Sequence, residues 1–193
     1  MFFTLLAAAT AQAAAPAPAA AAAPVVDPRM ARMAALYDEV CLKAFPDDKA
    51  VDKALAAHGA TPLTAEQVRV TLVDDPGRGW QVPDEGTPVL VFLELPTYHA
   101  CSVRWNGPAG KADLSAYRAV SDPYLARYTG WLTLPPMEMD RGDIHVAGVT
   151  TARMTGDGSD ALMMIEQSPT DPVRRAAGEG GVDRRFVHQM RTR

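Results

Sequence analysis

The stretch from Thr87 to Trp105, TPVLVFLELPTYHACSVRW, limits the possible folds of this chain more than any other part of it. Its first half contains an unbroken apolar run, Val89 to Leu93, between two prolines, which is typical of a buried strand. After one turn, residues 99–105 place apolar side chains at every second position, which is the pattern of a half-buried strand. We therefore expect a central strand at 88–95 followed by a second strand at 99–105.

The N-terminal segment has the features of an export signal. Residues 1–26 carry no charged side chain, and a short apolar core precedes Ala11-Gln12-Ala13, which has the small-x-small form of a cleavage site. The core is shorter than the roughly 20 residues that a membrane-spanning helix needs. We therefore predict a signal peptide at 1–13, an Ala/Pro tether at 14–26, and an exported, periplasmic protein without a transmembrane span.

The chain contains two cysteines, Cys41 and Cys101. Apolar residues at spacings of three and four predict a helix over 28–45 with Cys41 on its buried face. An exported chain meets an oxidising compartment, so one Cys41–Cys101 disulfide is expected. The alternative keeps both thiols reduced, and His99 then joins them in a thiol–imidazole site that acts as a nucleophile or binds a metal.

Capping residues indicate where the helices begin. Asp27 and Pro28 fit the N-cap and first residue of the first helix. Thr64 and Gln67 fit a capping box, which predicts a helix over 65–72. Asp113 is a candidate cap for a helix in the middle of the chain.

These elements predict an α+β fold in which N-terminal helices and a mid-chain helix pack on a mainly antiparallel sheet. Residues 27–168 form one domain by length. A helix, a Gly-Trp pair and three strands occur twice, over 64–105 and 113–167, which suggests an αβββ pseudo-repeat. From residue 169 the periodicity is lost while Pro, Gly and Arg accumulate, so 169–193 is expected to be a flexible basic tail.

Charge and motifs restrict the function. The formal net charge is −4; residues 171–193 hold six Arg and three acids (+3), so residues 1–170 carry −7 (−4 minus +3). An acidic body disfavours nucleic acid as a partner. The chain has no HExxH, GxGxxG, P-loop, GxSxG or CxxC motif, which are the signatures of several common enzyme classes. We predict no catalytic residue, no cofactor and no metal ion.

Aromatic and polar side chains around the two central strands are candidates for a shallow ligand-binding cleft. They are Trp80, Tyr98, His99, Arg104 and Trp105. The preferred function is that of a non-catalytic envelope protein that binds another envelope protein or a small ligand. The alternative is a small periplasmic hydrolase or metal-dependent enzyme that uses His99 with nearby acids such as Glu94. The sequence does not specify an oligomeric state.

Three segments resemble a family of exported proteins and lipoproteins of unknown function from alphaproteobacteria. They are CLKAFPDD (Cys41–Asp48), DDPGRGW (Asp74–Trp80) and LELPTYHACSVRW (Leu93–Trp105). The resemblance covers about residues 35–105 and includes both cysteines. It implies export, but the family has no assigned activity and therefore supplies no functional residue. Lipidated members carry a cysteine at the cleavage site, which this chain lacks.

Overall fold

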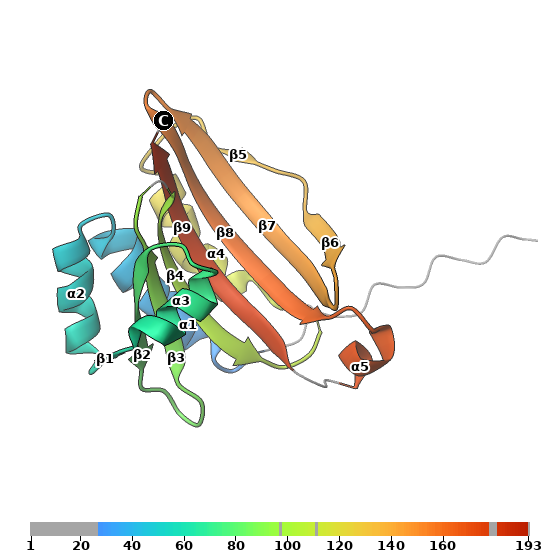
Figure 1. The fold of residues 1–193 in the computed structure, drawn as a ribbon. Helices are drawn as coiled ribbons and strands as arrows, with labels where there is room; N and C mark the ends of the chain where they lie inside the picture. The colour runs from blue at the N-terminus through green and yellow to red at the C-terminus, as the bar shows by residue number, and fades with distance from the viewer. Residues whose placement is uncertain (1–26, 97, 111, 178–180, 193) are drawn as a thin grey trace, which may run out of the picture.

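A computed structural model describes residues 27–96, 98–110, 112–177 and 181–192. The predicted signal peptide and tether lie outside the described residues. The described chain has the predicted α+β fold, with helices packed on one antiparallel sheet (Figure 1). None of the described helices combines the length and apolar content needed to cross a membrane.

The sheet has nine strands in the order β1-β2-β3-β4-β9-β8-β7-β5, and β6 also pairs with β7. The predicted strands at 88–95 and 99–105 are β3 and β4, and the three long strands β7, β8 and β9 run diagonally across Figure 1. The strands are β1 (Thr61–Pro62), β2 (Gly77–Val82), β3 (Val89–Glu94), β4 (Tyr98–Gly107), β5 (Leu132–Thr133), β6 (Met137–Arg141), β7 (Ile144–Thr155), β8 (Gly158–Pro169) and β9 (Val182–Thr192).

The helices lie on both faces of this sheet (Figure 1). They are α1 (Met30–Tyr37), its π-helical continuation η1 (Asp38–Ala44), α2 (Asp48–Ala57), α3 (Ala65–Leu72), α4 (Ser115–Leu125) and α5 (Pro172–Ala176). α1, η1, α2 and α4 share one large apolar core with the sheet. α3 packs its Val68 and Leu72 against Phe92 in a separate small core, on the other face. The Thr64–Gln67 capping box is present.

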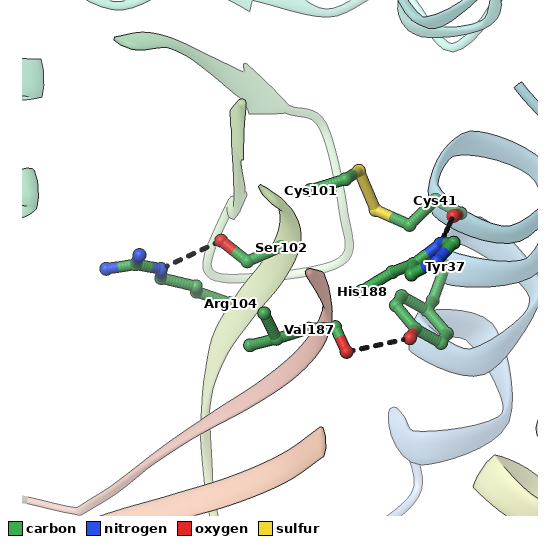
Figure 2. Close-up of a disulfide and its surroundings, with 7 residues drawn as sticks. All are labelled: Tyr37, Cys41, Cys101, Ser102, Arg104, Val187 and His188. Carbon is green, nitrogen blue, oxygen red and sulfur yellow. Dashed lines mark hydrogen bonds between the residues drawn. A yellow bond between two sulfur atoms is a disulfide. The ribbon is translucent and has the colours of Figure 1, made fainter. Parts of the chain in front are cut away.

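The disulfide prediction is confirmed. Cys41 on η1 and Cys101 on β4 are bonded, with Cα atoms 5.4 Å apart and both side chains fully buried. Figure 2 shows the bond on the helical side of β4. The alternative thiol–imidazole site is wrong, because both sulfur atoms are in this bond.

The start of the first helix differs from the prediction. The helix begins at Met30, and Arg29 occupies the N-cap position. Asp27 Oδ1 accepts a hydrogen bond from Arg29 N at 2.9 Å, but its Oδ2 accepts from Trp105 Nε1 and from Arg184 Nη1, both at 3.0 Å. The carboxylate is buried, so its main partner is a buried cation and not the helix end.

The prediction of a flexible basic tail at 169–193 is wrong for the part that the structure describes. Residues 182–192 form β9, which lies between β4 and β8 in the sheet. Every second side chain from Val182 to His188 is buried on the helical face, namely Val182, Arg184, Phe186 and His188, and Val187 is buried on the other face. The alternation is hidden in the sequence, because two of these four buried side chains are polar. The domain therefore extends beyond residue 168.

The predicted pseudo-repeat is consistent with the strand order. Residues 64–105 contain α3 and the consecutive neighbours β2-β3-β4, and residues 113–167 contain α4 and the neighbours β5-β7-β8. β6 interrupts the second segment, and α3 and α4 lie on opposite faces of the sheet. The repeat itself stays a prediction until the two segments are superposed.

We predict that the double variant Cys41→Ala/Cys101→Ala is less stable than the wild type by about 4 kcal/mol, since the bond closes a loop of 60 residues in the unfolded chain. Urea denaturation followed by circular dichroism measures the difference. If the variant and the wild type unfold at the same urea concentration, the disulfide does not contribute to the stability of the fold.

A second prediction concerns Asp84, which receives hydrogen bonds from Arg29 Nε (2.8 Å) and Arg32 Nε (3.0 Å). Burial alone would raise the pKa of Asp84, but the bonds from Arg32 and Arg29 outweigh it and lower the pKa below its ordinary value. The ionised form therefore stabilises the fold. We expect Asp84→Asn to cost about 1–3 kcal/mol at pH 7.

Because the folded-state pKa of Asp84 is lowered, its contribution is present above the unfolded pKa and is lost as the pH falls below about 4. The difference in unfolding free energy between wild type and Asp84→Asn should therefore shrink between pH 7 and pH 3. Glu85→Gln is the matched control, since the Glu85 side chain is 89% exposed. A difference that is equal at both pH values would contradict the prediction.

Candidate ligand-binding cleft

The structure does not bring the five predicted ligand-binding residues together. Trp80 and Trp105 belong to the main apolar core. Tyr98 is exposed, and the Arg191 guanidinium lies 5.0 Å from the centre of its ring. The two tryptophans therefore contribute to packing, and no shallow cleft is formed by the five residues.

Arg104 projects from the opposite face of β4 to His99 and Trp105, because side chains alternate along the strand. Figure 2 shows its side chain, with that of Ser102, on the opposite side of the strand from the disulfide. Its guanidinium packs on the Phe92 ring and lies 3.5 Å from Glu94. Burial, together with the neighbouring Arg185, lowers the pKa of Arg104 to about 10. Burial has the opposite effect on an acid, and it raises the pKa of Glu94.

His99 is on the helical face, where its Nε2 lies 3.0 Å from Asp48 Oδ1 and its ring packs against Phe45. Glu94 is on the other face, since it is the direct partner of Ala100 in the ladder and side chains alternate along β4. The predicted pairing of His99 with Glu94 is therefore not formed. Asp48 is the acid that His99 contacts.

A different region contains the best-formed cavity. A cleft of about 300 Å³ lies between strands β6–β8 and the loop that leads into α4, and we call it the apolar cleft. Most of its wall is apolar and comes from Ala112, Leu114, Met137, Val149, Met164 and Val182. Its polar lining side chains are Glu138, His145, Glu166 and Ser168. Clefts of this size and composition are typical sites for small ligands.

The apolar cleft exists because the helices cover only part of their face of the sheet. α1 and η1 pack on β4, η1 also contacts β9, and α4 reaches β9 through Tyr117 against Phe186 and Tyr124 beside His188. Toward β7 the helical layer ends, and half-buried side chains such as Ala147 and Val149 remain accessible. The loop before α4 then forms the facing wall through Ala112 and Leu114.

The facing wall is held in place by Arg184, whose side chain is fully buried beside the apolar cleft. Its Nη2 donates to the carbonyl oxygens of Pro108 (2.8 Å) and Gly110 (2.9 Å), which belong to the loop. Its Nε donates to Glu166 Oε1 at 2.8 Å, and its Nη1 donates to Asp27. One guanidinium therefore positions both the loop and the carboxylate that faces the apolar cleft.

Cross-strand pairing places the polar residues of the apolar cleft in two neighbouring rows. In one row Glu138, Ala147, Glu166 and Arg184 are direct partners from β6 to β9. In this row the small side chain of Ala147 lies between two glutamates. Direct partners in an antiparallel sheet project from the same face, so both carboxylates border the same space.

The second row contains Asp140, His145 and Ser168. Asp140 Oδ1 lies 2.7 Å from His145 Nδ1, which is the arrangement of acid and imidazole in a serine hydrolase. In the described part of the chain, however, no hydrogen bond joins His145 Nε2 to the Ser168 hydroxyl. A serine without a bonded base is a weak nucleophile, so this row supplies polarity and not an activated hydroxyl.

A buried polar cluster lies on the helical face of the sheet, near the disulfide. His188 Nδ1 lies 2.7 Å from the carbonyl oxygen of Cys41, and its Nε2 lies 2.9 Å from Asp160 Oδ1 and 3.2 Å from the Tyr124 hydroxyl. Arg153 donates to Asp160 Oδ2 at 3.0 Å. Burial raises the pKa of Tyr124, which keeps its hydroxyl protonated. None of these side chains lines the apolar cleft.

A second hollow, of about 660 Å³, lies beside α3 and the turn after it, and Trp80 is part of its lining. Its arginines are already paired with acids. Arg69 bonds Asp74 at 2.9 Å, and Arg78 bonds Asp52 at 2.8 Å. This hollow is wider and more open than the apolar cleft, so the apolar cleft is the better-formed site.

The apolar cleft has no local signal in the sequence, because its residues come from separate parts of the chain: the loop before α4, strands β6–β8 and the start of β9. Within the residues that the structure describes, no three His, Cys, Asp or Glu side chains are arranged to hold a metal ion.

Comparisons with protein-family models, curated proteins and solved structures find no match to this chain.

We predict that Gly107→Ala disturbs the Arg184 network. A Cβ atom on Gly107 would overlap the Arg184 guanidinium and lie 2.6 Å from Asp27 Oδ2. We expect a loss of about 1–3 kcal/mol in unfolding free energy, as for other overpacked sites. Gly156→Ala is the control, because a Cβ atom there meets nothing within 4 Å. Equal stability of the two variants, measured by urea denaturation, would contradict the role given to Arg184.

Proposed function

We propose that this protein is an exported, non-catalytic binding protein and that it binds a small apolar ligand in the apolar cleft. The observation that carries the proposal is a cleft of about 300 Å³ with a mainly apolar wall. Its volume is at the lower end of the range for ligand sites, so the expected ligand is small. Accessible apolar surface of this kind is usually kept for a ligand or partner.

The buried disulfide supports export. A bond between two fully buried cysteines forms and persists in oxidising compartments such as the periplasm and is rare in the cytosol. It agrees with the leader predicted at 1–13. The resemblance to exported proteins and lipoproteins, which the sequence suggests, points to the same compartment.

A binding role accounts for the site better than catalysis does. His99 has an acid partner, Asp48, but His99 lines neither the apolar cleft nor the second hollow. His145 lines the apolar cleft and is bonded to Asp140, but Ser168 is not hydrogen bonded to it. A hydrolase of the serine type needs the acid, the imidazole and the nucleophile connected in one place.

The test is to fill the apolar cleft with a side chain. Ala147→Leu adds a bulky apolar group at the middle of the floor, at a half-buried position that borders the open space of the apolar cleft. We expect the neutral dye N-phenyl-1-naphthylamine to bind the wild type saturably, and we expect the variant to bind it about tenfold more weakly. A fluorescence titration measures both affinities.

Ala152→Leu is the matched control, because Ala152 is also half-buried on β7 but projects from the opposite face. It should leave the dye affinity unchanged. Absence of saturable binding to the wild type, or equal loss of affinity in both variants, would refute the proposed site.

A further inference from the structure

We infer that the apolar cleft selects a positively charged amphiphile, such as an aliphatic amine, and this inference rests on the proposed function. The apolar part of the ligand would lie along Leu114, Val149 and Met164, and its ammonium group would lie above Ala147 between Glu138 and Glu166.

The first step is the spacing of the two carboxylates. Glu138, Ala147 and Glu166 are direct cross-strand partners on β6, β7 and β8. Neighbouring strands are about 4.8 Å apart, so the two glutamates start about 10 Å apart and have only a methyl group between them. All three residues line the apolar cleft. A small cationic group fits between the carboxylates, where its N–H groups can donate charge-assisted hydrogen bonds to both of them.

The second step is the charge of the buried network. Arg184 carries one positive charge and is in contact with two carboxylates, Asp27 at 3.0 Å and Glu166 at 2.8 Å. These three groups together carry −1. Asp27 and Arg184 are fully buried, whereas the Glu166 side chain remains 16% exposed. The uncompensated negative charge therefore faces the apolar cleft through Glu166.

The third step is the absence of competing cations. Among the described residues that line the apolar cleft, His145 is the one basic side chain, and it is bonded to Asp140 at 2.7 Å. In the described part of the chain Glu138 takes part in no ion pair. The donors of Arg184 point to Asp27, Glu166 and two loop carbonyls, so they are not directed at a ligand. An anionic ligand would meet two glutamates without a compensating donor.

The experiment compares three ligands that share one alkyl chain: octylamine, octanol and octanoate. Each is used to displace N-phenyl-1-naphthylamine from the wild-type protein at pH 7.5, where the amine is cationic and the acid anionic. We expect octylamine to bind about tenfold more tightly than octanol, and octanoate to bind most weakly. The preference for the amine should decrease at high salt, because Glu138 is exposed.

The variant Glu138→Gln tests the assignment to this row, since its side chain is exposed and makes no ion pair that the described structure contains. It should weaken octylamine binding about threefold and leave octanol binding unchanged. Glu85→Gln, an exposed glutamate that does not line the apolar cleft, is the control and should change neither affinity.

The outcomes separate this inference from the proposed function. If octanol and octylamine bind the wild type equally well, selection for a cation is wrong while the apolar site stands. The same conclusion follows if Glu138→Gln and Glu85→Gln have the same affinity for octylamine. If none of the three ligands displaces the dye and Ala147→Leu does not affect dye binding, the apolar cleft itself is not the site.

Discussion

The fold depends on the neutralisation of one buried cation. Arg184 lies in the middle of the sheet on β9 with a fully buried side chain. Burial of an unpaired guanidinium would cost several kcal/mol, so the surrounding chain must supply acceptors. They come from three regions: Asp27 at the start of the described chain, Glu166 on β8, and the carbonyl oxygens of Pro108 and Gly110. Arg184 thereby links these three regions, and its bonds to the two carbonyl oxygens fix the loop that forms the facing wall of the apolar cleft.

At the other end of β9 the same face is fixed by a covalent bond and a second polar cluster. The disulfide joins η1 to β4, and His188 contacts the carbonyl oxygen of Cys41 one strand away. Tyr37 donates to the carbonyl oxygen of Val187 at 3.0 Å (Figure 2). The helical layer is therefore held over β4 and β9, and it does not extend to β7. The uncovered part of the face is the floor of the apolar cleft.

Local patterns in the sequence were sufficient for the elements with ordinary chemistry. The capping box of Thr64 and Gln67 and the buried run of β3 follow from residue types and spacing. The Cys41–Cys101 bond follows from two cysteines in a chain with a predicted export signal. β9 was missed for a physical reason. A hydrophobic pattern assumes that buried positions are apolar, but Arg184 and His188 are buried with partners that are distant in the sequence.

The site was predicted less well than the fold. Simple alternation along β4 already separates His99 from Arg104, since an odd and an even position project from opposite faces. The two tryptophans near them are core residues, which is the commoner role of a large aromatic side chain beside a sheet. The residues of the apolar cleft meet only after β6, β7, β8 and the loop before α4 have assembled, so no local spacing could identify them.

The position of β9 also affects how the chain can reach its native state. A polypeptide made from its N-terminus produces the β2-β3-β4 meander first and the β7-β8 hairpin later, and the strand that joins them follows both. Until β9 inserts, β4 and β8 each present a row of unpaired backbone groups, and such rows readily pair with other chains. Pairing between distant strands is also slow. Nascent molecules are therefore most vulnerable to self-association in the interval before this last joining step.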